Sequence, residues 1–148
     1  MANKLSTRDV AAIQEKRVAK KLGGFVNSNS GAGRWDKSDV KVHDASLLIE
    51  CKTTMTPKKS FSIKKEWLDK TKDESFANRF YNHAIAFNFD YENKNDYYVI
   101  DDKLMKFLVE KLIEENEWFL VIMCYNITVK IITSFNKYGG TLWTLVSL

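Results

Sequence analysis

Residues 38–53 read SDVKVHDASLLIECKT, and this stretch decides the fold of the first half of the chain. Valines alternate with polar residues over 38–42, residues 47–53 form a mostly apolar run, and HDAS separates the two. This pattern predicts an antiparallel hairpin. A symmetric hairpin pairs residues whose numbers sum to 89, so that Val40 faces Ile49. A slip of one residue would set Val40 against Leu48 or Glu50 and mix the apolar and polar faces.

In this register Asp39 faces Glu50, and Lys52 shares a face with Glu50 because side chains two apart on a strand point the same way. Adjacent carboxylates repel each other unless a cation lies between them. Oxygen ligands suit Mg²⁺, and the backbone carbonyl of Cys51 could be a further ligand. Lys52 could orient the attacking water or stabilise negative charge developing on a phosphate. These groups are what hydrolysis of a phosphodiester requires.

The rest of the chain predicts further helices and strands. A helix over 7–22 follows Ser6, a suitable N-cap, and ends at Gly23-Gly24. Helices are expected over 64–79 and 101–116, and strands over 25–26, 84–89, 97–100, 121–133 and 142–148. The order predicts an α/β fold with a mixed central β-sheet flanked by helices, in one domain spanning residues 1–148.

Composition and charge exclude several classes of protein. The 148 residues are 45% hydrophobic and 28% charged, an ordinary globular balance. Residues 1–72 carry 16 Lys+Arg and 8 Asp+Glu (+8), whereas residues 73–148 carry 7 and 11 (−4), which together give the net +4. The basic half favours a polyanionic partner. No apolar run approaches the ~20 residues of a membrane span, so no membrane partner is expected. Two cysteines and two histidines favour a reducing, cytoplasmic compartment and a metal held by oxygen.

Asp39, ten intervening residues and then Glu50-Cys51-Lys52 resemble the signature of the PD-(D/E)XK nuclease superfamily. With QEKRVAKKLG at 14–23 and the small-residue loop SNSGAG at 28–33, the first half is similar to archaeal and phage Holliday junction resolvases. The resemblance covers about residues 7–75. It implies a restriction-endonuclease-like fold in which Glu15, Asp39 and Glu50 bind divalent metal and Lys52 assists catalysis. It also implies that Ser28 and Ser30 contact DNA.

Two features depart from the family pattern or compete with it. Ser38 stands where the family usually has proline before the first acid, and Asp36 lies close enough to be mistaken for that acid. We prefer Asp39 because the register places it opposite Glu50. Basic residues near the motif in sequence are expected to contact DNA phosphates, with plain solvated charges as the alternative for each one. Those we select are Lys37, Lys41, Lys58 and Lys59.

The sequence therefore predicts an Mg²⁺-dependent DNA endonuclease, with Mn²⁺ able to substitute, that resolves four-way junctions in recombination or repair. Paired cuts on two strands favour a homodimer, and the apolar segment 119–125 with Trp143 could supply its interface or belong to the core. The expected location is the cytoplasm, at the nucleoid or in a phage host. Alternatives are a nuclease of this fold acting on restriction-type or flap-type DNA, or a catalytically silent DNA-binding protein.

Overall fold

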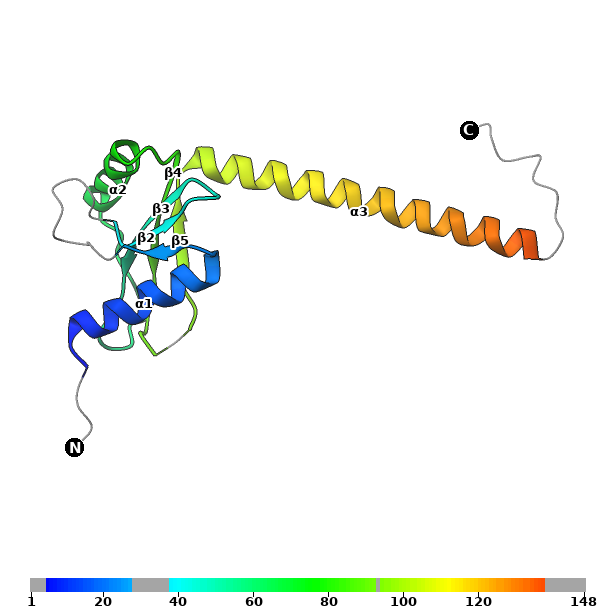
Figure 1. Ribbon diagram of the computed structural model, residues 1–148. Coiled ribbons are helices and arrows are strands. Elements are labelled where there is room, and N and C mark those ends of the chain that lie inside the picture. The colour runs from blue at the N-terminus through cyan, green and yellow to red at the C-terminus, as the bar shows by residue number, and fades with distance from the viewer. Residues whose placement is uncertain (1–4, 28–37, 93, 138–148) are drawn as a thin grey trace. The chain divides into compact units, whose positions relative to one another are not determined.

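A computed structural model of the chain describes residues 5–27, 38–92 and 94–137; for residues 120 and 126–137 it describes the helix but not the side chains (Figure 1). The chain divides into two compact units, Met1–Leu104 and Met105–Leu148. That these form the one domain expected from the sequence stays a prediction. The elements in chain order are α1 (Thr7–Leu22), β1 (Phe25–Val26), β2 (Val40–Val42), β3 (Leu47–Lys52), α2 (Lys65–Ala77), β4 (Asn82–Phe87), β5 (Tyr97–Ile100) and α3 (Asp102–Lys137).

The first unit is a mixed α/β structure, as expected from the sequence. Its five strands lie in the order β1-β2-β3-β4-β5, with β3 and β4 parallel and every other neighbouring pair antiparallel. The parallel pair requires a crossover, and α2 supplies it. The finer expectation, a restriction-endonuclease-like fold, stays a prediction.

The β2–β3 register confirms the hairpin expected from the sequence. Val40 pairs with Ile49, and Val42 pairs with Leu47. Asp39 lies one residue beyond this ladder, so the expected pairing of Asp39 with Glu50 is not part of it. The parallel β3–β4 pair then sets Glu50 beside Ile85 at the centre of the sheet.

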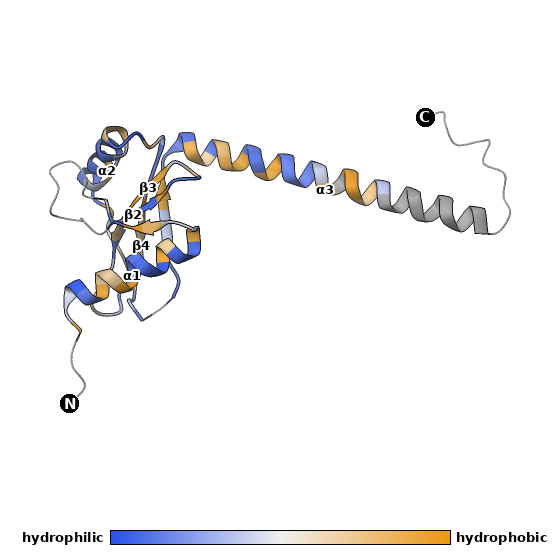
Figure 2. Ribbon diagram, in the orientation of Figure 1, coloured by the Kyte–Doolittle hydropathy of each residue, from blue (hydrophilic) through white to orange (hydrophobic). Residues whose placement is uncertain are grey.

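The two helices of the first unit cover opposite faces of the sheet. Val18 of α1 belongs to the same buried cluster as Val40 and Ile49. On β3 the neighbouring positions Glu50 and Lys52 instead meet residues of α2. Because successive strand residues point to opposite faces, this buried cluster lies on the α1 side, and the two motif residues lie on the α2 side together with the buried Leu48. Figure 2 shows the central strands largely in hydrophobic colours and many hydrophilic residues along α1 and α2.

Both ends of α1 form as the sequence predicts. The Ser6 hydroxyl accepts the N–H of Asp9, and the Asp9 carboxylate accepts the N–H of Ser6, which makes a capping box. Gly23 ends the helix with φ of 66°, a left-handed conformation that favours glycine. A Cβ on Gly24 would lie 2.7 Å from the carbonyl oxygen of Lys41, so β1 can run this close to β2 only without a side chain there.

The prediction of strands within residues 121–133 is wrong, because α3 continues through them to Lys137. The β-branched residues there favoured strands, but strand preference depends on neighbouring strands. The described part of the chain provides no such partner, and a helix satisfies its own backbone hydrogen bonds. The apolar residues Phe119 and Tyr125 are exposed on this helix rather than part of a core. The expected strand 142–148 and Trp143 lie outside the described residues.

None of the helices in residues 5–27, 38–92 and 94–137 has the length and hydropathy of a membrane-spanning segment.

Candidate active site

Asp39 reaches the end of β3 through its side chain as well as its backbone. The Asp39 N–H donates to the carbonyl of Ile49 at 3.2 Å, and its Oδ2 accepts the N–H of Cys51 at 2.7 Å. The carboxylate thus takes a place that a backbone carbonyl of β2 would fill if the ladder continued. Asp39 therefore lies beside the end of β3, where a side-chain hydrogen bond holds it, and its expected pairing with Glu50 stays a prediction.

Glu50 is a buried carboxylate with one oxygen satisfied and one without a partner. Its residue exposure is 6%. Oε1 accepts a hydrogen bond from Lys52 Nζ at 2.6 Å and lies 3.4 Å from Lys70 Nζ. Oε2 is buried and makes no hydrogen bond within the described part of the chain. A buried charged oxygen without a partner is costly, so this atom indicates a place where a cation or a donor from a ligand would be stabilised.

Helix α2 completes the surroundings of Glu50 with residues that the sequence did not single out for the site. Lys52 Nζ lies 5.4 Å from the centre of the Trp67 ring, a cation–π contact that holds the ammonium beside the carboxylate. Lys70, one helical turn beyond Trp67, also lies 3.7 Å from Glu74. Burial lowers the pKa of Lys70, but the charges of Glu50 and Glu74 outweigh burial and raise it above its ordinary value.

The three predicted acids repel one another. Burial, followed by the negative charge of Glu50, raises the pKa of Asp39 from 3.8 to about 7, although the hydrogen bond from Cys51 opposes the shift. Glu15 on α1 is half-buried, and its pKa is raised by burial first and then by the charge of Glu50. The carboxyl groups of Asp39 and Glu15 are therefore harder to ionise than in water, and a divalent cation would relieve this.

The donor atoms fit a divalent cation held by two carboxylates. Across residues 5–27, 38–92 and 94–125, no three His, Cys, Asp or Glu side chains are grouped as a metal site. The carboxylates of Asp39 and Glu50 nevertheless lie close enough to interact electrostatically, and Glu50 Oε2 has no hydrogen-bond partner among the described residues. The Cys51 carbonyl lies on the β2 side, where its N–H meets Asp39, because both groups of a strand residue point the same way. Mg²⁺ commonly uses one or two carboxylates and takes its other ligands from water and phosphate.

Cys51 is otherwise a core residue, as expected from the sequence. Its side chain packs against the buried cluster on the α1 side, and burial followed by the charge of Asp39 raises the pKa of its thiol. A thiol in this state is a poor nucleophile.

The predicted DNA-contact residues are only partly described. Lys58 and Lys59 are exposed in the segment before α2, and the Lys58 N–H donates to the carbonyl of Phe89 at 2.7 Å. Lys41 is half-buried on β2. The remaining predicted contacts, Ser28, Ser30 and Lys37, lie outside the described residues, as does Asp36.

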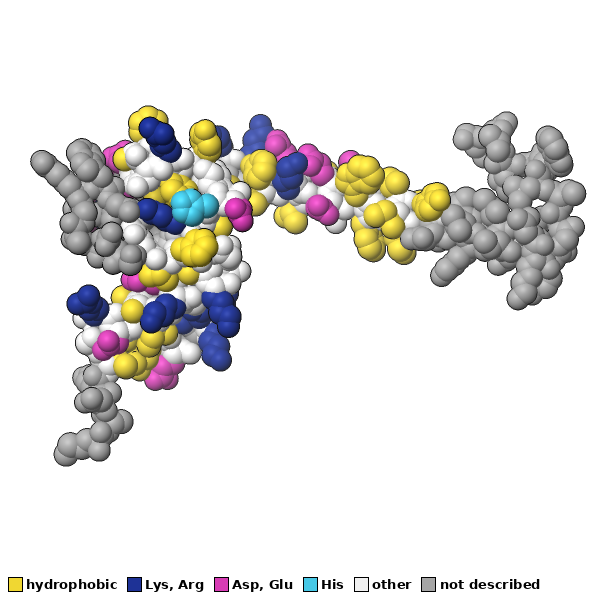
Figure 3. Space-filling model, viewed as in Figure 1, with side chains coloured by type: hydrophobic (Ala, Val, Ile, Leu, Met, Phe, Trp, Pro, Cys, Tyr) yellow, Lys and Arg dark blue, Asp and Glu magenta, His cyan; other side chains and the backbone are white. Residues whose placement is uncertain are grey.

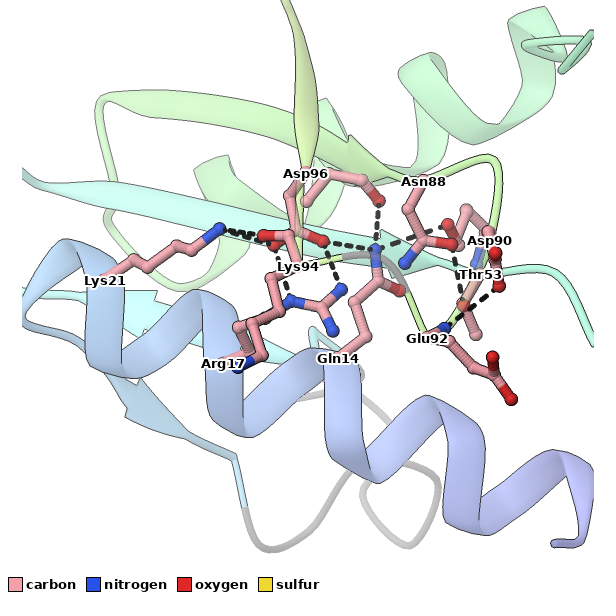
Figure 4. A network of polar contacts seen from close by, with 11 residues as sticks. Gln14, Arg17, Lys21, Thr53, Asn88, Asp90, Glu92, Lys94 and Asp96 are labelled. Atoms are coloured by element: carbon pink, nitrogen blue, oxygen red, sulfur yellow. Dashed lines mark hydrogen bonds and ion pairs between the residues drawn. The ribbon is translucent and has the colours of Figure 1, made fainter. Parts of the chain in front are cut away.

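Gln14, the residue before Glu15, joins α1 to the sheet. Its side chain is 1% exposed, and Nε2 lies 3.4 Å from the carbonyl oxygens of Lys52 and Ala86 (Figure 4). Because these carbonyls belong to the ends of β3 and β4, Gln14 fixes the rotation of α1 and thereby the side on which Glu15 projects. Sequence reasoning missed this role; a glutamine between Val10 and Val18 on the apolar face was its only signal.

A second ion-pair group that sequence reasoning missed lies on the same helix. Arg17 donates two hydrogen bonds to Asp96, at 2.8 and 2.6 Å, and Lys21 lies 3.3 Å from the same carboxylate (Figure 4). The Asp96 side chain is fully buried. Burial alone would raise the pKa of Asp96, but the hydrogen bonds and charges of Arg17 and Lys21 hold it below its ordinary value.

Comparison with known proteins gives no relative for the chain: no family model, no curated protein and no solved structure matches it.

Proposed function

We propose that this chain is a metal-dependent DNA endonuclease of the restriction-endonuclease-like fold, and that its substrate is branched DNA, four-way junctions above all. The observation that carries the proposal is the half-buried Asp39 close to the buried Glu50 and Lys52, with Glu50 Oε2 making no hydrogen bond to a described residue. A carboxylate pair that raises the pKa of one member is costly in a merely structural strand. It is useful where a cation must be held next to a phosphate.

Asp39 and Glu50, with the Cys51 carbonyl, would hold Mg²⁺ or Mn²⁺, and Glu15 would face the same ion from α1. The bound ion supplies Lewis-acid neutralisation of the phosphate and lowers the pKa of water. Lys52 is held between Glu50 and the Trp67 ring, so its ammonium has a fixed position. There it stabilises the negative charge that develops on the phosphate as water attacks phosphorus and the bond to the leaving oxygen breaks.

Lys70 acts in this proposal as a positioning residue. Together with Lys52 it contacts Oε1 of Glu50, which leaves Oε2 as the oxygen available to a cation. Two ammonium groups on one oxygen also compensate the buried negative charge in the absence of metal.

The test is cleavage of a labelled synthetic four-way junction and of a linear duplex of the same sequence, with Mg²⁺ and with chelator. The wild type is expected to cut the junction only with Mg²⁺. Asp39→Asn and Lys52→Ala should each slow cutting about 100-fold or more, as expected for the loss of one group that stabilises the transition state. Asp44→Asn, an exposed carboxylate in the β2–β3 turn, is the matched control and should cut normally.

Each contrary outcome has a distinct meaning. Unchanged cutting by both Asp39→Asn and Lys52→Ala would overturn the site assignment. Equal or faster cutting of the linear duplex would replace the junction by another DNA substrate. DNA binding without any Mg²⁺-dependent cutting would refute the enzyme and leave a silent DNA-binding protein. A homodimer, which two symmetric cuts require, is tested by the mass of the protein in solution with and without junction DNA.

A further inference from the structure

Helix α1 carries basic residues on the flank opposite Glu15. At 100° per residue, the stripe formed by Ile13, Lys16, Arg17 and Lys20 is centred roughly 150° around the helix from Glu15. The buried residues of the helix, among them Gln14 and Val18, lie between these two flanks. The charges of this stripe are therefore not part of the candidate active site, although they are adjacent to Glu15 in sequence.

A groove of about 490 Å³ lies along this stripe. The residues that line it from α1 are Ile13, Lys16, Arg17 and Lys20. The opposite wall is the segment between β4 and β5, with Tyr91, Glu92 and Lys94. Figure 3 shows Lys and Arg side chains gathered over α1 on the face in view.

Ion pairs to the buried Asp96 carboxylate hold the two walls together. Arg17 makes its two hydrogen bonds to the fully buried Asp96, and Lys21 contacts both Asp96 and the backbone carbonyl of Lys94 (Figure 4). These contacts fix the segment before β5 against α1, and they neutralise the charge of Arg17. The groove is thus part of the fold of the first unit and does not depend on the arrangement of surface side chains alone.

The groove retains a net positive charge, because its lining residues include Lys16, Lys20 and Lys94 but only one acid, Glu92. Lys16, Lys20 and Lys94 are exposed and form no ion pair with a described residue. Glu92 is the one acid among the lining residues, and its Oε1 accepts the Tyr91 hydroxyl at 2.9 Å. Lys16 and Lys20 are about 6 Å apart along the helix axis. A DNA strand carries one phosphate per ~3.4 Å of its axis, so these two lysines match a line of phosphates better than one small anion.

We propose that this groove binds the phosphodiester backbone of DNA, as a second contact away from the phosphate that is cut. The proposal rests on the proposed function, because it takes DNA as the ligand of the first unit. The two flanks of α1 then differ in whether they need a metal ion to bind phosphate. The acids around Glu15 repel phosphate until a cation is bound, whereas the lysines of the groove attract phosphate without any metal.

The test compares Lys16→Gln/Lys20→Gln with Lys72→Gln/Lys103→Gln, which removes the same two charges from exposed positions outside the groove. Affinity for a four-way junction is measured without divalent metal over a range of salt concentrations. The groove variant should bind at least about tenfold more weakly at 0.1 M salt, and its salt slope should fall by about 2, one for each lost phosphate contact. The control variant should bind as the wild type does, and both should have the wild-type melting temperature.

An unchanged salt slope in the groove variant, or a loss equal to that of the control variant, would overturn the proposal. The proposal would also be overturned if the groove variant lost binding to phosphatidylserine vesicles but bound DNA as the wild type does. The anion bound by the groove would then be a lipid headgroup. Because binding is read without metal, a protein that binds DNA through the groove but never cuts it would refute only the proposed function. A protein that cuts junctions while the groove variant binds normally would refute only the groove.

Discussion

Replacing Asp39 with asparagine is expected to remove a pH-dependent loss of stability from the metal-free protein. The folded protein raises the pKa of Asp39 to about 7 from an ordinary value of 3.8, chiefly by burial. Between these two pH values the folded protein keeps a proton that the unfolded chain has lost. The free energy of unfolding therefore falls as pH rises from about 4 to about 7, and the full loss is present above pH 7.

The expected size of the effect follows from the two pKa values. Each pKa unit corresponds to about 1.4 kcal/mol, so ionising Asp39 in the folded protein lowers the free energy of unfolding by about 4 kcal/mol across this range. The asparagine side chain of the variant cannot ionise, but its amide oxygen can still accept the N–H of Cys51. Asp39→Asn should therefore be more stable than the wild type above pH 7 and close to it near pH 4.

Urea unfolding at pH 4 to 8 with chelator measures this difference, and Asp44→Asn serves as the control for removing a surface carboxylate. Adding Mg²⁺ at pH 8 should stabilise the wild type and leave Asp39→Asn nearly unchanged, because a bound cation compensates the charge that the variant lacks. If the free energy of unfolding depended on pH in the same way for the wild type and Asp39→Asn, the reasoning would be refuted. Asp39 would then not be the group whose ionisation destabilises the folded protein.

Three further predictions concern groups around the site. Lys70→Met keeps the aliphatic stem of the side chain but removes one of the two ammonium groups beside Glu50. The carboxylate should then attract a cation more strongly, and the Mg²⁺ concentration for half-maximal cutting should fall severalfold. An unchanged Mg²⁺ titration would contradict the role of Lys70. Asp96→Asn leaves Arg17 without its buried carboxylate partner and should lower the free energy of unfolding by about 3–5 kcal/mol in urea titrations. A loss below ~1 kcal/mol would mean that the pair is not buried. Ser6→Ala breaks the capping box and should cost about 1 kcal/mol, measured in the same way, with Ser6→Asp as a variant that restores stability.

The hairpin that carries the site could be predicted from the sequence because its apolar pattern permits one register. Val40 and Val42 must share a face with Leu47 and Ile49, and this requirement alone sets which residues are opposite each other. The proximity of Asp39 and Glu50 follows from it. The pattern could not show that the β2–β3 ladder ends before Asp39, because side chains on a strand would alternate between its two faces in the same way before and after Val40.

The contacts that α2 makes with the site could not be predicted in the same way. Trp67 and Lys70 reach Glu50 and Lys52 because the β3–α2–β4 crossover lays this helix over the even-numbered face of β3. Their positions in sequence indicate only an amphipathic helix. Which of its polar residues meets the sheet depends on the rotation of the helix, and short-range patterns do not determine that rotation.

The prediction of strands within residues 121–133 failed for a different reason. Their composition favours strands, but the strand preference of a residue depends on pairing and packing, and these are set by distant parts of the chain. The helical alternative needs no partner for its backbone. A prediction from composition alone therefore fails here while the same reasoning succeeds for residues 47–52, where an apolar neighbour strand lies within a few residues.

The net charges of the two halves of the sequence do not show which positive charges are available to a partner in the folded protein. The excess of +8 in residues 1–72 counts Arg17, Lys21, Lys52 and Lys70 as though they faced a partner, but each is paired with a carboxylate. Their charges stabilise the fold and the site and are less able to attract distant phosphates. The groove on α1 gains Lys94 instead, a residue from the acidic half of the sequence. The proposed polyanion-binding surface therefore depends on which lysines lack a carboxylate partner, and the fold decides this, not the count of charges in either half.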